Sequence, residues 1–183
     1  KQLSYLFKPR KRRKRAINSP PTLHNIELQA LAIRTGRIYI QELPALTRQE
    51  TELFFDIESV PDQDLHYLHG LLIYQGKEST YHSFWADEVG NEEAIWQAFL
   101  AKINQYPDAP IYHYGSYESR TVAKLAKKYA TDTENLIKRL VNIHKQIYGK
   151  IYFPAYSNRL KDVAGFLGAN WMESNASGLQ SIV

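Results

Sequence analysis

The chain has 183 residues, which is enough for one domain with a single hydrophobic core and an extension, and too few for two full domains. It contains no cysteine, which excludes disulfides and thiolate metal sites, so any metal ion would be held by carboxylates, histidines and water. No apolar run approaches the roughly 18 residues that span a membrane, and no signal peptide is visible. We therefore expect a cytoplasmic protein without a membrane partner.

The positive charges gather near the start of the chain. Seven of them fall within eight residues: Lys8, Arg10, Lys11, Arg12, Arg13, Lys14 and Arg15. Without this run the formal net charge drops from +4 to −3, so the remainder is mildly acidic. A basic run is typical of a solvated linker, of a localisation signal or of a contact with nucleic-acid phosphates, and composition leaves all three open.

Composition divides the chain into three parts. Residues 1–21 form a basic N-terminal arm or linker that ends at Pro20 and Pro21, because proline cannot continue a helix. Residues 22–50 form a small lead-in segment, and residues 51–183 form the main domain. Because the chain starts without a methionine and ends on an apolar tail, we expect it to be a piece of a larger protein.

Alternating apolar residues predict a series of strands. A short strand at 37–40 belongs to the lead-in segment, and three more follow at about 52–57, 66–74 and 79–85. Three successive strands with short turns indicate an antiparallel meander. The apolar run at 71–74 predicts burial of the second strand on both faces.

Helical spacing takes over after the meander. The predicted elements are helices at about 91–104 and 116–129, a strand at about 111–114 and a short helix at about 160–167. Asn91 is placed to cap the first helix, and the fourth strand, entered after a helix, should run parallel to the first. Segment 133–148 is ambiguous, since part of it suits a short edge strand as well as a helix. Trp85 and Trp96 are expected in the core.

Two carboxylates end the first strand of the meander. Asp56 and Glu58 are separated by one residue, so both should emerge on one face, with Ile57 on the other. A divalent cation is the usual reason to hold two such charges together, and a solvated polar strand end is the alternative. The order β-β-β-α-β-α is that of the ribonuclease-H-like α/β fold, a mixed central sheet flanked by helices. In that layout Glu118, which starts the helix after strand four, lies beside the end of strand one.

An ordered series of segments resembles the ribonuclease-H-like domain of RecB-family nucleases, which are related to the DnaQ-type (DEDD) exonucleases. The segments are Phe54-Phe55-Asp56-Ile57-Glu58, Pro61-Asp62, Tyr67-Leu68-His69-Gly70, Ser83-Phe84-Trp85-Ala86-Asp87 and His113-Tyr114-Gly115-Ser116-Tyr117-Glu118, with further matches at 7–12, 30–34 and 154–168. The resemblance covers nearly all the chain. It implies a metal-dependent exonuclease that hydrolyses phosphodiester bonds of DNA or RNA with two Mg²⁺ or Mn²⁺ ions.

The resemblance also implies roles for individual residues. Asp56, Glu58 and Glu118 correspond to catalytic, metal-binding carboxylates of the family. The family's last acidic residue lies in a segment that this chain does not contain, so the site would be incomplete here. The resemblance places additional nuclease or helicase domains in the full-length protein. The alternative function is a catalytically silent module that binds nucleic acid or acts as a scaffold beside such domains.

Several other residues are candidates with a competing structural interpretation. The ring of Tyr117 could stack on a base, although core packing explains it equally well. Lys161 and the basic run at residues 8–15 are candidate phosphate contacts. Asp162 is a weak substitute for the missing carboxylate, because its segment predicts a packing helix. His113 is interpreted as a hydrogen-bonded strand histidine rather than as a ligand.

Overall fold

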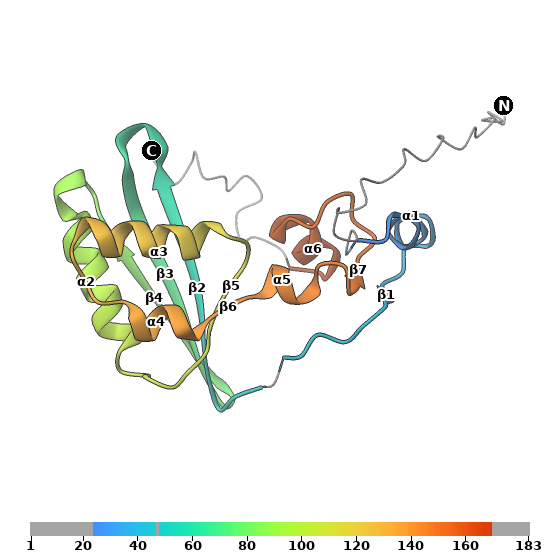
Figure 1. The fold of residues 1–183 in the computed structure, drawn as a ribbon, viewed down its shortest axis with the longest axis horizontal. Coiled ribbons are helices and arrows are strands. Elements are labelled where there is room, and N and C mark those ends of the chain that lie inside the picture. Colours follow the sequence, from blue (N-terminus) through green and yellow to red (C-terminus); the bar gives the residue numbers. More distant parts are fainter. Residues whose placement is uncertain (1–23, 47, 170–183) are drawn as a thin grey trace, which may run out of the picture.

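The computed structural model describes residues 24–46 and 48–169, so the basic run at residues 8–15 lies outside the described part of the chain. The strands form a five-stranded sheet and a separate two-stranded sheet, with helices around them (Figure 1). The elements in chain order are α1 (Ile26–Thr35), β1 (Tyr39–Ile40), β2 (Thr51–Val60), η1 (Pro61–Gln63), β3 (Leu65–Gln75), β4 (Glu78–Trp85), η2 (Val89–Asn91), α2 (Glu92–Ile103), β5 (Ile111–His113), α3 (Tyr117–Lys128), α4 (Glu134–Arg139), β6 (Leu140–Asn142), α5 (Ile143–Ile147), β7 (Ile151–Tyr152) and α6 (Leu160–Phe166). None of the described helices is long and apolar enough to cross a membrane.

The large sheet has the strand order β4-β3-β2-β5-β6. Strands β2, β3 and β4 pair antiparallel and form the predicted meander. Strand β5 pairs parallel with β2, with Leu53 opposite Ile111 and Phe54 opposite Tyr112, and β6 pairs parallel with β5. This mixed sheet flanked by helices confirms the predicted ribonuclease-H-like α/β fold. The ambiguous segment contains both predicted possibilities, because β6 lies between two short helices.

One face of the large sheet carries the main core. Leu53, Phe55 and Ile57 alternate along β2 and are at most 5% exposed, because side chains two residues apart on a strand share a face. They pack against α2, α3 and α4, which lie together on one side of the sheet in Figure 1. Trp96 of α2 is fully buried in this core, as predicted. The predicted cap is less complete, since the Asn91 side chain accepts no hydrogen bond from the described first turn of α2.

The opposite face of the sheet is only partly covered. Phe54, Tyr81 and Trp85 on this face are 38%, 61% and 48% exposed. The core position predicted for Trp85 is therefore wrong, because alternation along β4 places Trp85 on the same open face as Tyr81; its ring lies beside Tyr67, with 5.7 Å between centroids. The predicted burial of both faces of β3 holds only in part, since Leu72 is half-buried.

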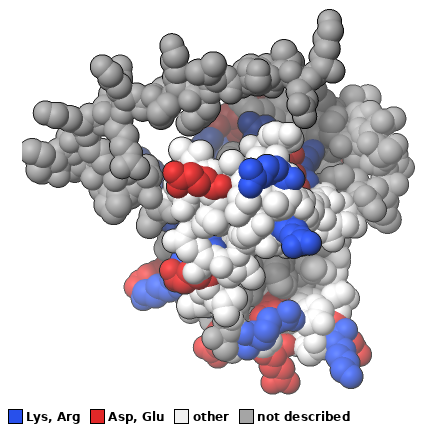
Figure 2. All heavy atoms as spheres, turned by 90° about the vertical axis from the view of Figure 1, so that its right-hand side faces the viewer, with Lys and Arg blue, Asp and Glu red and all other residues white. Residues whose placement is uncertain are grey.

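The lead-in segment packs against the C-terminal part of the described chain. Strand β1 pairs antiparallel with β7, and the backbone N–H of Asn25 donates to the Tyr152 hydroxyl at 2.9 Å. The side-chain amide of Gln29 donates to the carbonyls of Phe153 and Ala155, each at 2.8 Å. These contacts form the smaller group at the right of Figure 1. On the face that Figure 2 shows, positive and negative side chains are interspersed among the described residues.

A buried carboxylate joins three elements of the larger part. Glu92, at the start of α2, is fully buried and accepts hydrogen bonds from Lys128, from Tyr129 and from the backbone N–H of His66. Burial alone would raise its pKa, but these donors outweigh burial and lower the pKa to about 2. The carboxylate therefore stays charged and holds the ends of α2 and α3 against the start of β3.

The core also contains an isolated histidine. His69 of β3 is fully buried and stacks against Phe99, with ring centroids 5.2 Å apart, and lies beside Phe55 and Trp96. Neither of its ring nitrogens has a hydrogen-bond partner among the described residues. Burial disfavours the imidazolium form and lowers the pKa of His69 to about 4, so the ring is neutral at pH 7.

Candidate active site

Two of the predicted site residues lie near the end of β2. Asp56 and Glu58 line the same hollow of about 470 Å³, as their alternation along the strand predicts. Ile57 between them is 3% exposed and packs into the core on the other face. Its backbone N–H donates to Asp56 Oδ1 at 3.1 Å. Most of the remaining lining is apolar side chains of the open sheet face, and Leu160 of α6 also contributes.

Glu118 reaches this hollow from the first turn of α3. Because β5 runs parallel to β2 and beside it, the loop after β5 comes close to the end of β2, as the strand order predicts. Glu118 is 5% exposed, and the Nδ1 atom of His113 lies 3.3 Å from its Oε2 atom. His113 is thus a buried strand histidine with a hydrogen bond. That its partner is Glu118 could not be foreseen from the sequence.

The loop before Glu118 is held by Asn142, at the end of β6. The backbone N–H of Gly115 donates to Asn142 Oδ1 at 3.2 Å, and the amide nitrogen of Asn142 donates to the carbonyl of Gly115. The same Oδ1 accepts from the N–H of Lys145 at 3.3 Å in the first turn of α5. An asparagine donates and accepts at once, which a carboxylate cannot do. Sequence reasoning missed this positioning role.

Tyr81 covers the space opposite Asp56. Gly70 is the partner of Asp56 across the β2–β3 pair, and a Cβ atom added to Gly70 would lie 2.9 Å from the Tyr81 hydroxyl oxygen. The tyrosine ring therefore uses the room that the missing side chain leaves. Burial and the charge of Asp56 both raise the pKa of Tyr81, so its hydroxyl keeps its proton and can donate it in a hydrogen bond.

The carboxylates repel one another. The pKa of Asp56 is raised to about 6, first by burial among the walls of the hollow and then by the charges of Glu58 and Glu118. Solvent still reaches Asp56, so water relieves part of this repulsion. A raised carboxyl pKa means that the charged form is disfavoured, and either a proton or a cation would relieve it.

The donor chemistry of the hollow suits a hard divalent cation. Three carboxylates supply oxygen ligands, which Mg²⁺ and Mn²⁺ prefer. Within residues 24–46 and 48–169, however, no three histidine, aspartate or glutamate side chains stand close enough together to form a metal cluster. The predicted ligands thus line one hollow, but among the described residues they are not close enough together to form a complete metal site.

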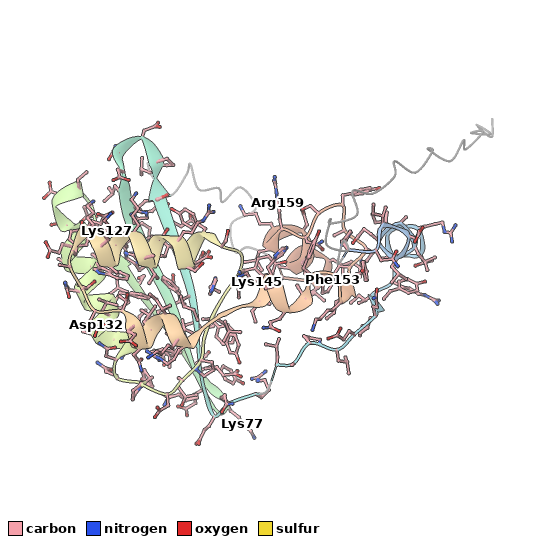
Figure 3. The ribbon with its side chains drawn as sticks, viewed as in Figure 1. Lys77, Lys127, Asp132, Lys145, Phe153 and Arg159 are labelled. Carbon is pink, nitrogen blue, oxygen red and sulfur yellow. The ribbon has the colours of Figure 1, made fainter. Side chains whose placement is uncertain are left out.

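Tyr117, Lys161 and Asp162 are not among the residues that line the hollow. Tyr117 is 38% exposed and donates from its hydroxyl to Ser59 Oγ at 2.5 Å. Lys161 is exposed in the first turn of α6, close along the chain to Arg159, which Figure 3 labels. Asp162 contacts the hydroxyl of Ser157 and does not line the hollow. The predicted phosphate contacts at 8–15 lie outside the described residues.

The strand order, with Asp56 and Glu58 on β2 and Glu118 on the helix that follows the adjacent parallel strand β5, defines an α/β protein of the ribonuclease-H-like layout. A model of the RNase H superfamily matches residues 53–183, a range that includes Asp56, Glu58 and Glu118, and the chain belongs to this superfamily. No curated protein and no solved structure matches the chain. Membership indicates a nuclease-like enzyme with a nucleic-acid substrate, and it does not distinguish among the subfamilies.

Proposed function

We propose that the chain is a metal-dependent nuclease domain that hydrolyses phosphodiester bonds of DNA or RNA. The observation that carries this proposal is the meeting of Asp56, Glu58 and Glu118 in one hollow of an RNase H superfamily chain. Bound Mg²⁺ or Mn²⁺ would supply Lewis-acid chemistry and a water of lowered pKa. Asp56 lines the hollow with both other carboxylates and feels the charge of each, so we assign it as the ligand that the ions would share.

The protein's own groups have separate tasks in this proposal. Glu58 and Glu118 would each add negative charge near Asp56 and so favour the binding of two cations. His113 fixes the orientation of Glu118 through its hydrogen bond. Tyr81 offers a neutral O–H donor at the wall of the hollow, suited to a phosphate or sugar oxygen. Hydrolysis then transfers a water oxygen to phosphorus and releases the sugar oxygen with a proton.

The finer assignment follows the resemblance to RecB-family and DnaQ-type nucleases. We propose a two-ion, DEDD-type exonuclease that cuts from the 3′ end and that works beside further nuclease or helicase domains. The last carboxylate of such a site would come from outside the described residues. Because the described residues do not form a complete set of metal ligands, the proposal requires this further carboxylate.

The test uses end-labelled single- and double-stranded DNA and RNA, with the longest natural form of the protein in Mg²⁺, in Mn²⁺ and in EDTA. We expect degradation that needs the metal and that Asp56→Asn or Glu118→Gln lowers about a hundredfold or more. Asp87→Asn is the matched control, because Asp87 is exposed and does not line the hollow. Activity that survives Asp56→Asn would contradict the proposal.

A second candidate function is a silent module that binds nucleic acid for a neighbouring nuclease or helicase domain. The open set of ligands among the described residues favours it. This function predicts binding that does not depend on Mg²⁺ and no cutting in any metal, even in the longest natural form. In a natural form that is longer than this sequence, an acidic pair in a predicted helix after Val183 would favour the enzyme.

A further inference from the structure

A second pocket lies next to the carboxylate hollow. It measures about 400 Å³, and its lining comes from the end of β2, from η1, from the start of β3 and from α3. We call it the α3 pocket. The polar lining residues used below are Ser59, Asp64, Tyr117, Arg120 and Lys124. None of these except Tyr117 is among the residues that sequence reasoning selects.

The α3 pocket and the hollow share a wall. Ser59 directly follows Glu58 on β2, and Tyr117 directly precedes Glu118 on α3, so neighbouring residues face the two spaces. The hydroxyl of Tyr117 donates to Ser59 Oγ at 2.5 Å, which joins the two sides of the wall. A group bound in the α3 pocket is therefore separated from the carboxylates by one residue step along β2 and one along α3.

The positive charge of the α3 pocket comes from one face of α3. Arg120 and Lys124 are one helical turn apart and both exposed. The Nε atom of Arg120 donates to the carbonyl of Ser116 at 3.0 Å, which leans the side chain over the first turn. Within the described part of the chain, Arg120 has no carboxylate partner. Its terminal N–H groups have the planar arrangement that binds two phosphate oxygens.

Lys124 is paired, but weakly held. Its amino group contacts Asp64, whose side chain is 66% exposed, and Lys124 lowers the pKa of this carboxyl. Exposed ion pairs contribute little to stability, so exchange of the Asp64 carboxylate for another anion costs little. Asp64 therefore occupies the place that an anionic ligand would take.

A nucleic-acid strand carries one charged phosphate per nucleotide, and the carboxylates of the hollow repel it. We propose that the α3 pocket binds the phosphodiester next to the scissile one, through Arg120 and, after exchange with Asp64, Lys124. This inference rests on the proposed function, because that function places the scissile phosphate at Asp56, Glu58 and Glu118. The attraction that the hollow lacks is thus supplied from the adjoining face of α3.

The experiment measures binding of a fluorescent single-stranded oligonucleotide in EDTA by anisotropy, over a range of salt. Loss of one phosphate contact lowers the log–log salt slope by about 0.7, which corresponds to about fivefold in affinity at 0.1 M salt. We expect this change for Arg120→Gln. Lys77→Gln removes the same charge from the turn between β3 and β4, at the end of the sheet opposite to Ser59 and Val60 (Figure 3), and should change affinity less than about twofold.

Asp64→Asn tests the inference in the opposite direction. It removes the competing carboxylate and frees Lys124, so the oligonucleotide should bind more tightly and with a steeper salt slope. Equal effects of Arg120→Gln and Lys77→Gln, weaker binding by Asp64→Asn, or no binding by the wild type would each overturn the inference.

Failure of the subsite can be told apart from failure of the proposed function. If the wild type cuts in Mg²⁺ and Arg120→Gln binds and cuts equally well, only the subsite is wrong. If Arg120→Gln weakens binding but no form of the protein cuts, the proposed function is wrong and the α3 pocket remains a phosphate site.

Discussion

Replacing Asp56 with asparagine should stabilise the metal-free protein, even though it removes the carboxylate that we place at the centre of the site. The pKa of Asp56 is raised from 3.8 to about 6. Each pKa unit corresponds to about 1.4 kcal/mol of free energy, so without solvent screening the charged form of Asp56 would destabilise the folded protein by about 3 kcal/mol. Because solvent still reaches Asp56 within the hollow, screening reduces this figure, and we expect a gain of about 1 kcal/mol for Asp56→Asn at pH 7.5.

The pH dependence follows from the direction of the shift. A carboxyl group whose pKa is raised by folding contributes its full stability below the unfolded pKa and loses it as the pH rises through the folded pKa. The advantage of Asp56→Asn should therefore be absent near pH 4, develop up to about pH 6, and stay constant above pH 7. The variant keeps an oxygen that can accept from the Ile57 N–H, so this hydrogen bond does not offset the gain.

Urea denaturation followed by tryptophan fluorescence measures the effect, in EDTA and then in Mg²⁺. At a concentration of 100 times the dissociation constant, a ligand stabilises the folded state by about 2.7 kcal/mol. Mg²⁺ should thus stabilise the wild type and reverse the order of the two proteins, while Asp87→Asn follows the wild type throughout. The reasoning is refuted if Asp56→Asn is less stable in EDTA, or if Mg²⁺ stabilises both proteins equally.

Two further substitutions test the surroundings of the site. His69→Phe removes a buried group whose pKa is lowered by folding from 6.5 to about 4. As the pH falls from 7 to 4, the free energy of unfolding of the wild type should therefore decrease by about 3 kcal/mol relative to that of the variant. A difference in urea denaturation that stays constant with pH would contradict a neutral His69. Asn142→Asp cannot donate to the Gly115 carbonyl and should cost about 1–3 kcal/mol and lower nuclease activity, whereas Asn135→Asp on the exposed side of α4 should change neither. Equal stability and activity of the two asparagine variants would remove the positioning role of Asn142.

The meander and the two longer helices could be predicted because each has its own periodicity. Leu53, Phe55 and Ile57 alternate, and the spacing of apolar residues in α2 and α3 matches one helix face. From this order the convergence of Asp56 and Glu118 also followed, since it needs only that β5 lie parallel and next to β2. These parts of the fold depend on local patterns plus one topological rule.

The remaining features depend on contacts between distant residues. The pairing of β1 with β7 joins segments far apart in the chain, and two residues on each side are too few to show a period. The three residues of β6 become a strand because β5 pairs with them. The bond from His113 to Glu118 and the placing of Tyr81 over Gly70 depend on side-chain packing in the finished sheet. The sequence shows the size of the Trp85 side chain but not the residues that surround it in the fold, which is why it suggests a core position.

The candidate site is assembled across the parallel pair of strands β2 and β5. Asp56 and Glu58 belong to the meander on one side, and Glu118 belongs to the segment that follows β5 on the other. The backbones of β2 and β5 pair at two positions, Leu53 with Ile111 and Phe54 with Tyr112. Any separation of β2 from β5 would carry Glu118 away from Asp56 and would also disturb the core that β2 shares with α3. An ion bound by carboxylates from both sides would hold the two strands together. Amide hydrogen exchange in β5 should therefore slow when the ion binds.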